Sequence, residues 1–137
     1  MENHDVVILG SGPGGYVTAI RASQLGFNTA IIEKESLGGI CLNWGCIPTK
    51  ALLKSAEVFD YLNHADSYGI EVENFSKNFK KVIERSRNVA GTMSKGVNFL
   101  MRKNKIKVYK GFGKINLDKT ITAVSYTHLT LPTNIGV

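Results

Sequence analysis

A glycine-rich segment directly after a short apolar run is the feature that most constrains the fold of this chain. Residues 5–9 read DVVIL, a β-branched run typical of a strand buried on both faces. Three glycines follow, Gly10, Gly12 and Gly15, in the pattern G-x-G-x-x-G. From residue 14 apolar side chains recur at helical spacing, until a glycine suited to a helix C-terminus. The sequence predicts a strand, a tight turn and a helix in immediate succession.

A second apolar run at residues 28–33, NTAIIE, predicts another buried strand. A strand, a helix and a strand within about 30 residues have the size of one βαβ unit, whose crossover is almost always right-handed. We therefore expect an α/β fold with a parallel two-stranded core and a crossover helix. The chain has 137 residues and a mass of 15.0 kDa, which is the size of one domain.

The three glycines of the motif have separate physical roles when the motif binds a dinucleotide. Gly10 makes the tight turn, Gly12 lets the backbone approach a pyrophosphate, and Gly15 lets the helix and the strand pack closely. The pyrophosphate rests on the positive end of the helix dipole. An acidic residue is expected at the end of the second strand to bind ribose hydroxyls, and Glu33 stands there. The motif does not distinguish FAD from NAD, and a purely conformational glycine turn is the alternative.

A pair of cysteines lies five residues apart in a second glycine-rich segment. In a regular helix the Cα atoms of Cys41 and Cys46 would be about 8.6 Å apart, whereas a disulfide requires about 7 Å or less. They can pair only if the segment departs from a regular helix, which the neighbouring glycines favour. A helix beginning near Pro48 would stabilise a thiolate at Cys46, and Lys50 would add a positive charge. The pattern favours redox chemistry over a zinc site or inert cysteines, since no further ligands have paired spacing.

The remainder of the chain predicts helices followed by short strands. A loop is expected at residues 36–45, a helix over 49–63 with Pro48 in its first turn, and a short extended piece at 69–72. Residues 76–102 predict one long amphipathic helix, weakened at two glycines, and residues 105–109, 113–117 and 119–123 predict antiparallel strands. The apolar seam expected on the long helix comprises Phe79, Val82, Ser86, Val89, Met93, Gly96 and Leu100.

The charge of the chain is unevenly distributed. The net charge is +6, yet residues 77–119 hold 13 of the 17 Lys and Arg and only 2 of the 11 acidic residues. Lysines scattered over a helix and a hairpin usually form a solvated face, so we expect no nucleic-acid partner. No segment approaches the roughly 20 apolar residues of a membrane span, so no membrane partner is expected. The chain begins without a recognisable secretory signal or transit peptide, which favours the cytoplasm.

The motifs together resemble a known enzyme family. GSGPGGY at residues 10–16, Glu33 with Lys34, and GGICLNWGCIPTKALLKSAEVF at 38–59 resemble the N-terminal part of the flavoprotein disulfide reductases. Among these the segments are most similar to dihydrolipoyl dehydrogenases. The resemblance implies an incomplete Rossmann-like FAD-binding domain with long helices and a small antiparallel hairpin. A glutathione or mercuric reductase type, or a stand-alone dinucleotide-binding module, is the alternative.

The resemblance also implies roles for individual residues. Cys46 would lie against the flavin and form the charge-transfer thiolate, Cys41 would exchange with the dithiol substrate, and Lys50 would lie near the reactive edge of the isoalloxazine. Electrons would pass from dihydrolipoamide through the disulfide to FAD and then to NAD⁺ as co-substrate. No metal is expected. The FAD-binding residues implied are Gly10, Gly12, Pro13, Gly14, Gly15, Glu33, Lys34, Gly39, Cys41, Cys46 and Lys50.

The partners and the domain boundary follow from the same resemblance. It implies lipoyl domains of 2-oxoacid dehydrogenase or glycine cleavage complexes as partners, and a homodimer when the enzyme is full-length. Residues 1–123 would form the N-terminal part of the FAD-binding domain, and by itself this part would be inactive. Residues 124–137 depart from the family's pattern, and we interpret them as an artefactual or disordered tail.

Overall fold

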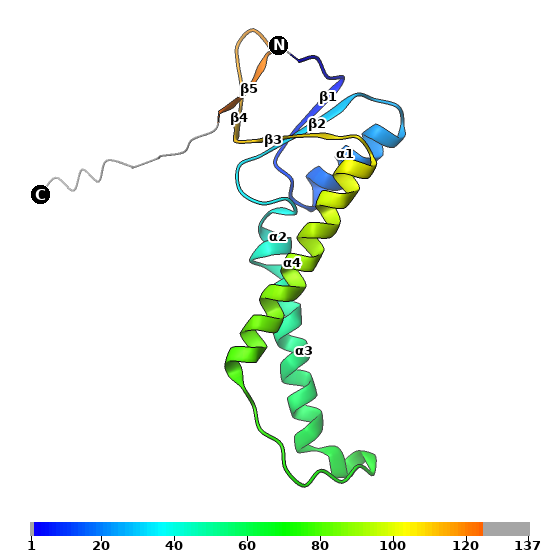
Figure 1. Cartoon of the computed structure of the whole chain (residues 1–137), viewed down its shortest axis with the longest axis vertical. Coiled ribbons are helices and arrows are strands. Elements are labelled where there is room, and N and C mark those ends of the chain that lie inside the picture. Colours follow the sequence, from blue (N-terminus) through cyan, green and yellow to red (C-terminus); the bar gives the residue numbers. More distant parts are fainter. Residues whose placement is uncertain (1, 125–137) are drawn as a thin grey trace, which may run out of the picture.

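A computed structural model describes residues 2–124 and contains a three-stranded parallel sheet (Figure 1). The strands are β1 (Val6–Leu9), β2 (Thr29–Glu33) and β3 (Lys107–Lys110), in the order β1-β2-β3. Ile8 pairs with Ile31 across β1 and β2, and Ile31 pairs with Val108 across β2 and β3. Helix α1 (Pro13–Gln24) joins β1 to β2, so the predicted βαβ unit is confirmed.

The core lies between this sheet and the helices that pack on it. Ala19 of α1 and Ile31 of β2 are fully buried, and Met101 of α4 (Phe79–Lys103) is buried against them. Gly26 follows α1 with a φ of +94°, and the N–H of Phe27 donates to the carbonyl of Ala22, as expected for a helix-ending glycine. The burial predicted for the second strand is confirmed, because Thr29 to Ile32 are all buried.

The burial predicted for the first strand is wrong. Val6, Val7 and Ile8 are only half-buried, and Leu9 is 41% exposed. The reason is that β1 pairs with β2 alone within residues 2–124, whereas β2 has a strand on each side.

Two long helices extend away from the sheet side by side (Figure 1). They are α3 (Cys46–Asn63) and α4, which are connected by the short 3-10 helix η1 (Ala65–Tyr68) and a segment without regular structure. Because that segment includes residues 69–72, the extended piece predicted there is not a strand. The side chain of Asn78 accepts a hydrogen bond from the N–H of Lys81 and so caps α4.

The buried face of α4 differs from the predicted seam. Its buried residues are Ser86, Ala90, Val97 and Met101, whereas Phe79 is 73% exposed. Met93, Gly96 and Leu100 of the predicted seam are exposed as well. Ser86 is the one buried residue that the predicted seam contains, and its hydroxyl donates to the carbonyl of Pro48 in α3. The helix continues through Gly91 and Gly96 without a break.

Only two of the three predicted antiparallel strands pair in that way. Strands β4 (Phe112–Ile115) and β5 (Ile121–Val124) form the expected hairpin. The strand predicted at residues 105–109 is β3, which pairs in parallel with β2 because α4 carries the chain back to the start of the sheet. The predicted tail at 124–137 lies outside the described residues, apart from Val124 at the end of β5.

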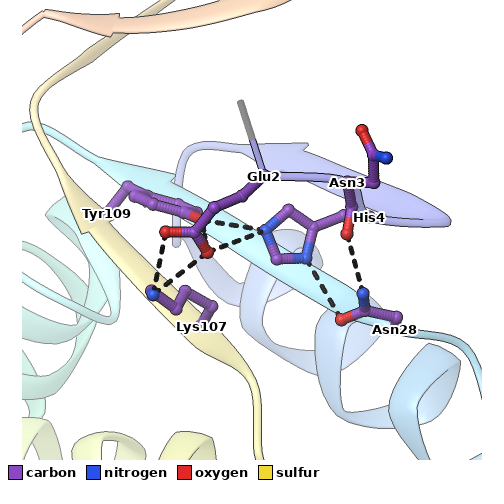
Figure 2. Close-up of polar contacts among 6 residues, drawn as sticks. All are labelled: Glu2, Asn3, His4, Asn28, Lys107 and Tyr109. Atoms are coloured by element: carbon purple, nitrogen blue, oxygen red, sulfur yellow. Dashed lines mark hydrogen bonds and ion pairs between the residues drawn. The ribbon is translucent and has the colours of Figure 1, made fainter.

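A polar network that the sequence did not predict connects the first residues of the chain to β3 (Figure 2). The ring of His4 lies 2.8 Å from the Tyr109 hydroxyl and 3.1 Å from Oδ1 of Asn28. The Tyr109 hydroxyl and the Lys107 ammonium both bind the carboxylate of Glu2. The hydrogen bond from Tyr109 and then the one from Lys107 lower the pKa of Glu2. The network therefore joins the segment before β1 to Asn28, which precedes β2, and to Lys107 and Tyr109 of β3.

Candidate functional site

The loop between β1 and α1 has the geometry predicted from its glycines. Gly10 has a φ of +89°, a conformation that favours glycine, and its N–H donates to the carbonyl of Ile32. A Cβ at Gly15 would collide with the carbonyl oxygen of Gly10, so only glycine permits this approach of helix and loop. Above Gly12 and Gly14 the space is open, since a Cβ at either would meet no atom within 4 Å. The N-terminus of α1 therefore faces unfilled space next to the loop.

Glu33, at the end of β2, is the acidic residue predicted beside this loop. Its Oε2 accepts hydrogen bonds from the N–H and the hydroxyl of Ser11, at 2.8 and 2.6 Å, and its Oε1 accepts the N–H of Glu35 at 2.8 Å. Burial opposes ionisation, but the hydrogen bonds from Ser11 and from backbone N–H groups outweigh it and lower the pKa of Glu33. The carboxylate is therefore ionised at neutral pH and held at the rim of the loop.

Ser11 is a site residue that the sequence analysis missed. Its side chain is fully buried, and its hydroxyl and carbonyl oxygens both accept the N–H of Gly38. Gly39 lies against Gly12, where a Cβ would come within 2.8 Å of the Gly12 Cα atom. The loop is thus fastened both to Glu33 and to the segment that leads to the cysteines. Nothing in the spacing of the motif distinguishes an inward-facing serine from a solvated one.

The two cysteines form a disulfide at a break between two helices. Helix α2 (Gly39–Asn43) occupies part of the segment predicted as a loop, because the N–H groups of Trp44 and Gly45 both donate to the carbonyl of Ile40 and close it. Helix α3 then begins at Cys46, three residues earlier than predicted. The break brings the Cα atoms of Cys41 and Cys46 to 4.7 Å, so the predicted departure from a regular helix is confirmed.

The two sulfur atoms have different environments. Cys46 is exposed and is the first residue of α3, an 18-residue helix, where the helix dipole stabilises a negative charge. Cys41 is half-buried within α2. Lys50 is exposed one turn into α3, on the same face of the helix as Cys46. Within residues 2–124 no three His, Cys, Asp or Glu side chains are grouped as a metal site.

A cleft of about 580 Å³ joins the loop, Glu33 and the disulfide. Four of the predicted residues do not line it: Gly14 and Gly15 lie within α1, and Cys46, the second half of the disulfide, and Lys50 lie in α3. Exposed apolar side chains of Leu9, Ile40, Trp44 and Phe112 form much of its wall. The predicted residues that line the cleft are Gly10, Gly12, Pro13, Glu33, Lys34, Gly39 and Cys41.

No helix within residues 2–124 has the length and apolar character needed to cross a bilayer.

The chain is similar in sequence to dihydrolipoyl dehydrogenases of several bacteria. Dihydrolipoyl dehydrogenase from Rhizobium etli is 59% identical over 115 residues, which cover 83% of this chain and 24% of the relative. Dihydrolipoyl dehydrogenase from Bacillus subtilis is 57% identical over 112 residues, 82% of this chain and 24% of the relative. The chain therefore spans about a quarter of the length of these curated relatives.

The fold and the family are shown by two further comparisons. The crystal structure of LpdA from Mycobacterium tuberculosis matches 85% of this chain and 28% of its own with a TM-score of 0.72, at 19% identity, which shows the fold. The family described as pyridine nucleotide-disulphide oxidoreductase matches residues 4–133. The chain belongs to the pyridine nucleotide-disulphide oxidoreductase family.

Proposed function

We propose that this chain is the FAD-binding start of a dihydrolipoyl dehydrogenase, which oxidises dihydrolipoamide and reduces NAD⁺. The observation that carries the proposal is the cleft in which a redox-capable cysteine, Cys41, lines the same space as the glycine loop and Glu33. The names and the 44–59% identities of the similar proteins support the choice of substrate. The proposal covers the whole enzyme, and we expect the 137 residues alone to be inactive.

The residues of the cleft fit a dinucleotide. The open space above Gly12 and the dipole at the N-terminus of α1 suit the pyrophosphate of FAD. The ionised Glu33 supplies a hydrogen-bond acceptor for its ribose. Bound FAD would supply a two-electron acceptor that returns a hydride to NAD⁺. The residues proposed to hold it are Gly10, Gly12, Pro13, Gly14, Gly15, Glu33, Lys34, Gly39, Cys41, Cys46 and Lys50.

The cysteines would perform a dithiol–disulfide exchange. A substrate thiolate attacks the sulfur of Cys41 and displaces the sulfur of Cys46 as a thiolate, which the start of α3 stabilises as a leaving group. The second substrate thiol then attacks the mixed disulfide. Its proton passes to the departing sulfur of Cys41, so the products are the oxidised cyclic disulfide, a thiol at Cys41 and the thiolate at Cys46. Two electrons thereby pass from the substrate to the pair, and Lys50 adds positive charge near the thiolate.

The partners and the location follow from the same proposal. A dihydrolipoyl dehydrogenase would act as a homodimer on lipoyl domains of 2-oxoacid dehydrogenase or glycine cleavage complexes in the cytoplasm. We also propose that residues 1–123 are the FAD-binding part and that 124–137 are foreign to it. The family match extends to residue 133, and re-sequencing of the source locus tests this boundary.

A chimera tests the enzyme. Residues 1–123 would be joined to the part of the Rhizobium etli relative that follows the aligned segment, and NADH formation from dihydrolipoamide would be measured. We expect turnover that Cys46→Ser abolishes, with no reduction of glutathione disulfide or mercuric ion. Turnover with glutathione disulfide instead would contradict the substrate. Stable yellow flavin binding by the 137-residue chain, with a long-wavelength thiolate band on reduction, would favour a stand-alone module.

A further inference from the structure

The buried hydroxyl of Ser11 has no role in the proposed exchange, yet it makes the shortest polar contact of the cleft. It lies 2.6 Å from Oε2 of Glu33, while the N–H of the same serine donates to the same oxygen at 2.8 Å. A serine hydroxyl has one proton, and the carbonyl of Ser36 lies farther away, at 3.4 Å. The proton is therefore donated to Glu33.

The orientation of this hydroxyl is fixed by its other neighbour. Its oxygen accepts the N–H of Gly38 at 3.2 Å, which directs the hydroxyl proton away from Gly38. Ser11 is completely inaccessible to water, so no solvent molecule competes for that proton from outside. The hydroxyl thus accepts from the N–H of Gly38 and donates to the carboxylate of Glu33.

These contacts leave one acceptor position of the Glu33 carboxylate free for a ligand. An ionised carboxylate has about four lone-pair sites, and Ser11 occupies two of them on Oε2 while the N–H of Glu35 occupies one on Oε1. By these three hydrogen bonds the remaining acceptor site is on Oε1, and the backbone N–H of Lys34 is a weaker influence that also lowers the pKa of the carboxyl. We propose that Ser11 is a positioning residue, whose hydroxyl holds Glu33 ionised and turned so that Oε1 accepts a hydroxyl of an adenosine ribose. The ribose part rests on the proposed function, whereas the link between Ser11 and Glu33 does not.

The carboxyl carbon of Glu33 reports the link directly. In the 137-residue chain without cofactor, ¹³C NMR would follow its titration in the wild type, in Ser11→Ala and in Ser23→Ala. Ser23 is the matched control, since its hydroxyl also donates a part-buried hydrogen bond, in its case to the backbone carbonyl of Asn104, away from the cleft. We expect a low Glu33 midpoint in the wild type and in Ser23→Ala, and a higher midpoint in Ser11→Ala. An unchanged midpoint in Ser11→Ala would overturn the proposal, and if that variant does not fold, a wild-type midpoint at or above that of an ordinary glutamate would do so.

Binding of FAD, measured in the chimera of residues 1–123 described above, separates the two levels of the inference. We expect Ser11→Ala to weaken FAD about five- to tenfold at pH 7, the size of one lost hydrogen bond, with a loss that grows as the pH is lowered. In the background of Glu33→Gln, the same Ser11→Ala change should have a much smaller effect. Equal losses in both backgrounds would make Ser11 merely structural. If no variant binds FAD while the NMR result holds, the proposed cofactor fails and the positioning by Ser11 stands.

Discussion

Strands β1 and β2 have similar sequences, VVIL and TAIIE, but unequal burial. Ile8 and Ile31 are direct partners across the two strands, yet Ile31 is fully buried and Ile8 only half-buried. The difference lies in their neighbours, because β2 is flanked on both sides while β1 has one paired edge within residues 2–124. Apolar sequence reports what a strand is able to bury, and its neighbours determine how much it buries.

The largest expected effect tests this comparison on its two isoleucines. Ile31→Ala should lower the free energy of unfolding by about 3–4 kcal/mol, because it leaves a cavity beneath α1 and α4. Ile8→Ala, the same deletion one strand away, should cost about 1.5–2 kcal/mol. Urea unfolding followed by circular dichroism measures both. Equal losses would mean that β1 is as well covered as β2.

The next effect concerns the loop that joins β1 to α1. Gly15→Ala should destabilise by about 2–3 kcal/mol, since the new Cβ meets the carbonyl oxygen of Gly10. Gly14→Ala is the matched control one residue earlier in the same helix, with open space around it, and should be neutral or slightly stabilising. The same urea titration applies to both variants. A tolerated Gly15→Ala would show that β1 and α1 separate easily.

A smaller effect is expected at the end of β2. The pKa of Glu33 is lower in the folded chain than in the unfolded one, so its carboxylate adds stability above the unfolded value of about 4.5, and this stability is lost as the pH falls. Between pH 7 and pH 3 the wild type should therefore lose more free energy of unfolding than Glu33→Gln does. The difference between the two losses should be smaller than the destabilisation caused by Gly15→Ala. Parallel curves for the two proteins would show that the hydrogen bonds of Glu33 are not maintained in solution.

Local patterns predicted the parts of the fold that neighbouring residues determine. The βαβ unit, the turn at Gly10 and the break between Cys41 and Cys46 all depend on chemistry within a few residues. The sequence did not predict the parallel pairing of β3, because β3 meets β2 only after α4 has crossed the sheet. The inward direction of Ser11 is likewise set by Glu33 and Gly38, more than 20 residues away.

The smallest effect is expected at the end of the sheet where its strands begin, opposite the end that carries Glu33. There the polar network joins the segment before β1 to β3. Tyr109→Phe removes the hydroxyl that lies between His4 and Glu2, a link between segments more than 100 residues apart. Tyr61→Phe is the control, because within residues 2–124 the hydroxyl of this exposed tyrosine reaches only Glu57, one turn away on α3. Tyr109→Phe should lower the urea midpoint slightly more than the control does, and 1 M salt should reduce the difference because the Glu2–Lys107 pair is exposed. Identical midpoints for the two variants would show that β3 is held by its backbone pairing with β2 alone.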